Sequence, residues 1–401
     1  MKTIKTMLFG LALAGLSVPA SAQEEQKEEQ KGYQFEEVVT NPYTTVKNQY
    51  RSGTCWSFST LSFIEAELLR MGKPEMDLSD MYVVHKAYQD KAEKYVRMHG
   101  TMNFGGGGAI NDITDVIRKY GMVPENVLEG LNYGTEGHTH GELDEILKSY
   151  VDAVIENKNK KLTTAWQKGY EGVLNAYLGE VPETFTYEGK EYTPRTFADE
   201  FMGIDADDYV MFSSYTHHPF YKPFIIEVQD NWSWSSVYNV PVDEMIEIFD
   251  NALENGYTIA WASDVSEKGF SWRNGVAIVP DEAKQDLTGT EQEKWEKLSK
   301  KDKQNMLYSF EEPVKEKVIT QEMRQEDFDN YQTTDDHGMH IVGIAKDQNG
   351  NKYYKVKNSW GTEQKYDGFF YASEAFIKYK TMSFMIHKDA TPKKLRKKLN
   401  F

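Results

Sequence analysis

The chain has 401 residues, and its 63 acidic side chains outnumber its 46 lysines and arginines, which gives a formal net charge of -17 at pH 7. Such acidity disfavours nucleic-acid binding, because DNA and RNA phosphates attract basic proteins. Aromatic residues make up 13% of the chain. That share argues against an intrinsically disordered protein and predicts a large buried core.

Residues 1–22 have the pattern of a signal peptide. A basic start is followed by an apolar run from Met7 to Val18 and by the small residues Ala20-Ser21-Ala22, which suit cleavage. The apolar run is too short for a membrane span, and a buried N-terminal helix is the alternative. We therefore predict export to a periplasmic or extracellular location, with no membrane anchor after cleavage. A polar, disordered tether is expected over residues 23–36.

Helical patterns dominate the first half of the chain. Apolar residues recur at helical spacing from Trp56 to Met71, which places Cys55 in the first turn of a helix. A second helical pattern runs from Ile110 to Tyr120, and long charged helices are expected between residues 140 and 180. Glu183–Tyr192 alternates like a β-hairpin.

The second half adds strands. A helix is expected over Pro241–Asn255, a buried strand over Gly256–Trp261, and a charged helical insertion over residues 284–304. We predict an α+β fold in one domain over residues 37–392, with insertions near residues 135–200 and 284–304, and a basic tail over residues 393–401. The strands expected in the last third are Ile341–Ala345, Lys352–Lys357 and Gly368–Tyr371.

Cys55 is the only cysteine, so it cannot form an internal disulfide. A thiol at a helix N-terminus is favoured as a thiolate by the helix dipole. A lone cysteine is more often an inert core residue, but two downstream motifs favour a reactive one. They are Asp336-His337-Gly338 and Asn358-Ser359-Trp360-Gly361. Cysteine, then histidine, then asparagine is an order typical of a nucleophilic cysteine site.

The roles of the candidate catalytic residues follow from their chemistry. His337 would accept the thiol proton and later return it, with His340 as its rival three residues on. Asn358 would orient the imidazole, and Trp360 would shield that hydrogen bond from water. Gln49 and the backbone N–H of the cysteine would stabilise an oxyanion.

Other motifs are less specific. Gly107-Gly108 could let a substrate backbone approach closely, or could simply precede a helix. The pairs His138–His140 and His217–His218 invite a metal interpretation, but no carboxylate or cysteine stands at an established ligand spacing from them. We therefore predict solvated loop histidines, no metal and no organic cofactor.

The chain resembles the bleomycin hydrolase and aminopeptidase C branch of the papain-like cysteine peptidases. In the segment around the cysteine, Ser52 stands where typical papains carry a disulfide cysteine. The likeness covers residues 40 to 390. The motifs that carry it are Asn48–Trp56, Leu78–Tyr82, Gly107–Pro124 and Met245–Val265.

This resemblance implies a papain-like fold and hydrolysis of peptide substrates by Cys55, His337, Asn358 and Gln49, with Gly107, Gly108 and Trp360 at the substrate. It also implies a homo-oligomer, hexameric in the family. In the family a C-terminal arm lies in the cleft and restricts cleavage to peptide N-termini, whereas the segment after Asn358 looks shortened here. Aminopeptidase action is therefore the first expectation. Broader endopeptidase action and a non-catalytic exported scaffold are the alternatives.

Overall fold

A computed structural model of the protein describes residues 31–283, 285 and 287–401. The predicted signal peptide and most of the predicted tether lie outside the described residues. The tether prediction is wrong for its last residues, because β1 (Phe35–Thr40) begins inside it. The ring of Tyr33 is buried and packs with that of Phe35 against Tyr353. Among the described helices, none has the length and apolar character needed to cross a bilayer.

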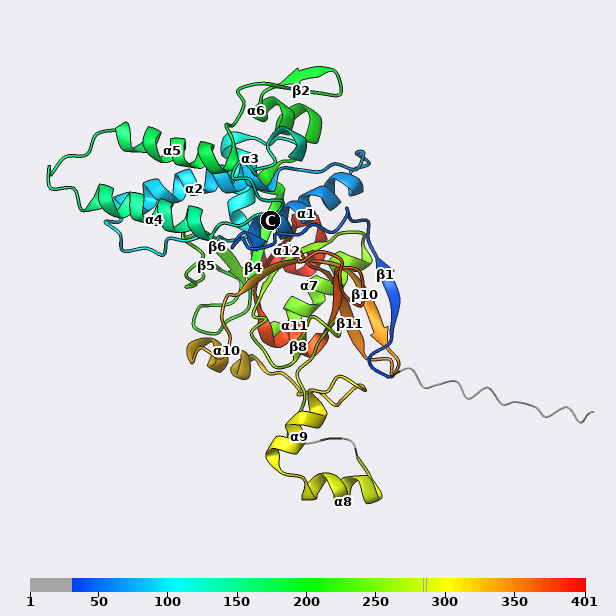
Figure 1. Cartoon of the computed structure of the whole chain (residues 1–401). Helices are drawn as coiled ribbons and strands as arrows, with labels where there is room; N and C mark the ends of the chain where they lie inside the picture. The colour runs from blue at the N-terminus through cyan, green and yellow to red at the C-terminus, as the bar shows by residue number, and fades with distance from the viewer. Residues whose placement is uncertain (1–30, 284, 286) are drawn as a thin grey trace, which may run out of the picture. The chain divides into compact units, whose positions relative to one another are not determined.

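Helices make up most of the described N-terminal half, as predicted (Figure 1). The predictions from Trp56 to Met71 and from Ile110 to Tyr120 are confirmed by α1 and α3. The long α2 was not predicted, because buried polar residues such as His85 and Lys91 interrupt its apolar pattern. The helices are α1 (Cys55–Arg70), α2 (Asp80–Arg97), α3 (Asn111–Tyr120), α4 (Gly141–Ile155), α5 (Ala165–Leu178) and the short α6 (Pro194–Thr196).

An 11-stranded sheet runs through the described residues in the order β5-β6-β4-β13-β7-β10-β11-β12-β9-β8, and β1 pairs with β10. Most neighbours are antiparallel, while β4–β6 and β12–β9 are parallel. The strands are β4 (Tyr209–Ser213), β5 (Pro223–Ile225), β6 (Ser236–Asn239), β7 (Ile259–Ser263), β8 (Phe270–Ser271), β9 (Val276–Ala277), β10 (His337–Asp347), β11 (Lys352–Lys357), β12 (Phe369–Ser373) and β13 (Thr381–His387).

The remaining elements agree with most of the sequence predictions. The hairpin is β2 (Phe185–Tyr187) with β3 (Lys190–Tyr192), and the helix after Pro241 is α7 (Val242–Glu254). The charged insertion forms two helices that extend away from the sheet, drawn in yellow in Figure 1. These and the later helices are α8 (Gly289–Lys297), α9 (Lys300–Leu307), α10 (Gln321–Asp329), α11 (Glu374–Lys380) and α12 (Lys393–Leu399).

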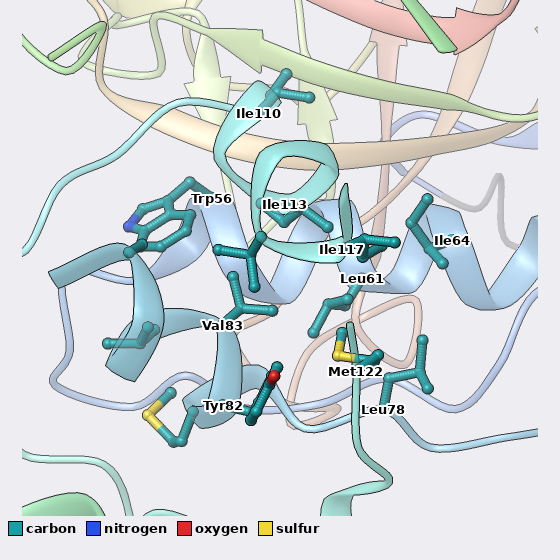
Figure 2. Close-up of a cluster of buried hydrophobic side chains, with 14 of the residues drawn as sticks. Trp56, Leu61, Ile64, Leu78, Tyr82, Val83, Ile110, Ile113, Ile117 and Met122 are labelled. Carbon is teal, nitrogen blue, oxygen red and sulfur yellow. The ribbon is translucent and has the colours of Figure 1, made fainter. Parts of the chain in front are cut away.

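Two hydrophobic cores lie on opposite faces of the sheet. The first joins α1, α2 and α3, and Figure 2 shows Leu61 and Ile64 of α1 facing Val83 of α2 and Ile117 of α3. The second packs α7, α11 and α12 against the other face. The cysteine and the histidine lie on the face of the first core, because α1 begins at the cysteine and packs along β10, which begins at the histidine.

The predicted basic tail is an amphipathic helix. Leu395 and Leu399 of α12 are buried in the second core, and the Phe401 ring lies against those of Phe212 and Tyr238. The basic side chains point outward, where Lys398 pairs with a glutamate of α7. The tail therefore packs on the sheet face opposite the first core.

Arg324 of α10 is a fully buried cation that should stabilise the fold. Its guanidinium lies 4.5 Å from the centre of the Tyr215 ring. It donates hydrogen bonds to four backbone carbonyls, those of Ser214, Lys378, Tyr379 and Thr381.

We predict that Arg324→Ala lowers the free energy of unfolding by about 3 kcal/mol or more, because several buried carbonyls lose their donor. Urea titration followed by circular dichroism measures the change. Arg273→Ala, at an exposed arginine, is the matched control and should shift the midpoint little. An Arg324→Ala midpoint equal to that of the control would contradict the assignment.

Candidate active site

The thiol of Cys55 lies at the first residue of α1. The carbonyl of Thr54 accepts the backbone N–H groups of Ser57 and Phe58, which starts the helix, while its hydroxyl contacts Ser52 at 2.6 Å and does not cap. The first turn carries no acidic residue. The unpaired N–H groups and the helix dipole therefore favour negative charge at the sulfur.

Gly338 lets β10 approach α1 closely. A Cβ at this position would lie 2.7 Å from Ser59 Oγ and 3.3 Å from Trp56 Cα. The Gly338 N–H also favours the thiolate form of Cys55, because it lowers the pKa of the thiol. The residue before it, His337, lines the same hollow as the cysteine. The small residue that follows the histidine is therefore a steric requirement.

The His337 imidazole is fixed on two sides. Its Nε2 lies 2.7 Å from Asn358 Oδ1, and its ring stacks on Trp360 with centroids 4.6 Å apart. Asn358 Oδ1 also accepts the N–H of Ser359 at 2.8 Å, which holds the amide in place. Because Nε2 faces the asparagine, Nδ1 is the nitrogen left for the thiol.

Gln49 is buried and is tied to the loop that follows the asparagine. Its Oε1 accepts the Ser359 hydroxyl at 2.6 Å, its backbone N–H donates to the Ser359 carbonyl, and its Nε2 donates to the Ser52 carbonyl at 2.9 Å. An amide nitrogen has two hydrogens, so one remains for another acceptor. One of the two Nε2 hydrogens is therefore used for the bond to Ser52, and these contacts fix the Gln49 side chain against the loop that contains Ser359. Gln49 is not among the residues that line the hollow described below.

His340, the rival histidine, lies away from the thiol. It is fully buried, and its Nδ1 is 2.9 Å from Ser62 Oγ, which also accepts Lys357 Nζ at 2.7 Å. Burial and the nearby ammonium both lower its pKa. It does not line the hollow described below. The histidine three residues earlier, His337, lines that hollow together with the cysteine.

A small hollow, with a cavity volume of about 30 Å³, lies beside the thiol. Two side chains at its edge were not found by sequence analysis, the carboxylates of Asp230 and Asp335. Of the two, only Asp335 could have been suspected from the sequence, because it lies two residues before His337. The other lining residues used below are Cys55, Gly108, Ile110, Met211, Ile226, Val228 and His337.

The two predicted substrate-binding glycines differ in their surroundings. Gly108 lines the hollow, and a Cβ there would lie 2.7 Å from the Trp56 ring. At Gly107 a Cβ would lie 2.2 Å from Asp230 Oδ2, so this carboxylate covers the residue. The Gly107 carbonyl also accepts Lys91 Nζ at 2.7 Å. Of the pair, only Gly108 is open to a ligand in the hollow.

Burial governs the electrostatics of the site. It raises the pKa of the Cys55 thiol to about 11, and the charges of Asp335 and Asp230 act in the same direction, while the Gly338 N–H opposes them. Burial lowers the pKa of His337 to about 4, which the Asn358 hydrogen bond partly offsets. Both shifts favour a neutral thiol–imidazole pair in the ligand-free site.

The prediction of solvated histidines is wrong for His138 and His140. Both are buried, with the first packed against Phe58 and the second against Tyr133. Burial lowers the pKa of each to about 4. They are aromatic core residues, which a spacing of two in a polar loop does not reveal.

We predict that Gly338→Ala slows alkylation of the thiol by iodoacetamide and lowers any turnover about 100-fold, because a shift near 1 Å at a reacting pair has that effect. Gly141→Ala is the matched control, since a Cβ there meets nothing within 4 Å. The alkylation is quenched at successive times, and mass spectrometry of the samples gives the rate of thiol alkylation. Equal rates in the two variants would show that the close approach does not position the thiol.

The comparisons with known proteins agree with this geometry. Aminopeptidase G of Lactobacillus delbrueckii subsp. lactis is 24% identical over 388 residues, covering 86% of this chain and 82% of the relative. Aminopeptidase C of Listeria monocytogenes is 23% identical over 396 residues, covering 88% and 82%. The crystal structure of PepW from Lactobacillus rhamnosis HN001 aligns with a TM-score of 0.67 at 19% identity, covering 91% of this chain and 84% of that one.

The expected α+β, papain-like fold is confirmed by the solved structures. The model of the Peptidase C1-like family matches residues 3–98, 82–306 and 289–401. These ranges take in the thiol, the histidine and the asparagine together. The chain therefore belongs to the Peptidase C1-like family.

Proposed function

We propose that this cysteine peptidase is an aminopeptidase that removes residues from the N-termini of peptides. The observation that carries the proposal is the convergence of Cys55, His337 and Asp335 on one hollow. It joins a nucleophile and its base to a carboxylate able to bind an ammonium group. The names of the relatives, aminopeptidases G and C, support the same reading.

The proposed reaction starts with proton transfer from Cys55 Sγ to His337 Nδ1 as the sulfur attacks the scissile carbonyl carbon. The negative oxygen is stabilised by the backbone N–H of the cysteine and by the Nε2 hydrogen that Gln49 has left. The imidazolium then gives its proton to the leaving amine, and water hydrolyses the thioester. Asn358 keeps the ring aligned throughout, and Trp360 covers the hydrogen bond between them.

Asp335 and Asp230 supply the preference for a free N-terminus. Burial raises the pKa of Asp335 to about 7, with further contributions from Asp230 and Asp336. Within the described residues, Asp335 has neither a hydrogen bond nor an ion pair, so its charge lacks a partner. A peptide ammonium placed in the hollow would supply one. Recognition of the free amine would then stop the enzyme from cutting inside longer chains.

Broader endopeptidase action is the second candidate, and one observation favours it. In β4, Met211 lines the hollow, whereas the adjacent Phe212 faces the second core and contacts Phe401. Neighbouring residues of a strand point to opposite faces. Residues 393–401 therefore pack on the far side of the sheet and do not fill the cleft as the family's arm would.

We also propose that the protein is exported and that it forms a homo-oligomer. Export rests on residues 1–22, which lie outside the described part of the chain. The homo-oligomer, hexameric by the family resemblance, rests on the helical insertions, of which α8 and α9 extend from the sheet. Size-exclusion chromatography with light scattering and fractionation of cells would address them.

We predict that Cys55→Ala abolishes hydrolysis while leaving the unfolding midpoint almost unchanged, because the thiol lies at a cleft and a smaller side chain fits there. Mass spectrometry of digests should use one peptide in a free and an N-acetylated form. Stepwise removal of single residues from the free form alone is expected. Internal cleavage of both forms would instead establish an endopeptidase.

We predict that Asp335→Asn raises KM for the free peptide about tenfold or more, because a carboxylate–ammonium hydrogen bond contributes about 1.5–3 kcal/mol. The same change lowers the pKa of Cys55, since it removes a charge that raises it. We therefore expect faster alkylation of the thiol at pH 7. Faster alkylation would show that the higher KM comes from lost substrate binding and not from a damaged thiol. Asp367→Asn, at an exposed aspartate outside the hollow, is the control. An unchanged KM would remove the carboxylate from substrate recognition.

A further inference from the structure

His217, His218 and Glu227 lie together at one edge of the sheet, outside the active site. The two histidines follow β4, and the glutamate follows β5. His217 Nε2 is 3.0 Å from Glu227 Oε2, and His218 Nε2 is 3.1 Å from Glu227 Oε1. The three ligand atoms all lie within 4.8 Å of one another. No carboxylate stands at an established ligand spacing from this histidine pair in the sequence, but β5 returns the chain past the pair and brings Glu227 beside it.

We propose that these three residues form a binding site for a divalent transition-metal ion, with Zn²⁺ as its best match. Two imidazole nitrogens and one carboxylate oxygen make a donor set that proteins use for zinc. The glutamate side chain is 58% exposed and those of His217 and His218 are 27% and 35% exposed. Water can therefore complete the coordination, and an ion can enter without opening the fold.

Outer contacts hold His217 ready for a metal. Gln325 Oε1 accepts the Thr216 N–H at 2.6 Å, and Gln325 Nε2 donates to Asp329 Oδ1 at 2.8 Å. Both amide atoms lie near His217 Nδ1, with Oε1 at 3.2 Å and Nε2 at 3.0 Å. When Nδ1 carries a proton and donates it to Oε1, the Nε2 lone pair faces the site, which is the arrangement that metal-binding histidines use.

Aromatic rings restrict both imidazoles. The His218 ring stacks on Phe224 with centroids 4.8 Å apart, and the His217 ring is nearly parallel to Phe328 at 5.6 Å. Such packing lowers the entropy that the rings lose on binding an ion. The site is therefore ordered by its neighbours as well as by the carboxylate.

The same geometry has a metal-free explanation that an experiment can separate. Two neutral imidazoles with protonated Nε2 atoms could each donate a hydrogen bond to Glu227. In that case the cluster would be a hydrogen-bonded triad that binds zinc no better than the rest of the surface. The charge of the carboxylate distinguishes the two explanations, because Glu227→Gln keeps the size of the side chain and an acceptor for one imidazole but removes the negative ligand.

The position of Glu227 links the ion to the hollow. Its neighbours Ile226 and Val228 both line the hollow, and Asp230 follows two residues later. A bound ion would anchor this wall to the loop after β4. The expected role is thus to stiffen the wall beside the thiol, without contact between the ion and the reacting atoms.

The experiment is a zinc titration by calorimetry of the full chain carrying Cys55→Ala, so that the catalytic thiol cannot bind the ion. One Zn²⁺ per chain and a higher melting temperature are expected. Adding Glu227→Gln or His218→Ala should weaken binding at least tenfold, whereas His99→Asn, at an exposed histidine, should leave it unchanged. Equal zinc affinity in the parent, Glu227→Gln and His218→Ala would overturn the proposal. A melting temperature equal to that of the parent, measured without zinc, would show that the variants fold.

Discussion

The contact between α1 and β10 at Gly338 is the constraint on which the active site depends. A side chain there would collide with Ser59 Oγ and Trp56 Cα. Without the glycine, the strand could not lie so close to the helix that its N–H lowers the pKa of the thiol and that His337 shares a hollow with Cys55. Gln49, Asn358 and Trp360 add hydrogen bonds and stacking around this contact. These added contacts can position the site residues only when α1 and β10 are packed together.

The acidic character of the hollow gives the site a second property. Asp230 and Asp335 oppose ionisation of the thiol when the hollow is empty. A cation that neutralised them would make the thiolate easier to form. Substrate binding and nucleophile activation would then be coupled, with the ammonium of the peptide favouring the reactive state of the sulfur. A resting enzyme with a protonated thiol would also be less exposed to oxidation.

Much of the fold could be predicted from the sequence where local signals suffice. The helix from the cysteine, the helix before Gly121 and the hairpin turn at Asn349-Gly350 follow from periodicity and turn residues. Helix α2 could not be predicted in this way, because its buried Lys91 and His85 bond to groups outside the helix. Lys91 donates to a carbonyl of the glycine run, and His85 contacts the Asn175 side chain. Such pairing cannot be read from a local window.

The same distinction holds for the sites. The cysteine, histidine and asparagine of the candidate site could be proposed from the sequence because each stands in a recognisable motif. Asp230 and Glu227 could not, because their positions depend on how β5 and β6 pair at the edge of the sheet. The metal candidate also shows the limit of spacing rules, since its carboxylate comes nine residues after His218.

The pairing of β1 with β10 has a consequence for how the protein matures. Phe35 is opposite Asp347 in the ladder, and Gln49 bonds to Ser359, 310 positions later. Such distant contacts form slowly and only after the intervening chain exists. During synthesis, the pairing of β1 and the site around the thiol can form only after the last fifth of the polypeptide has been made. The nascent chain thus cannot assemble this site until nearly all of it has been made.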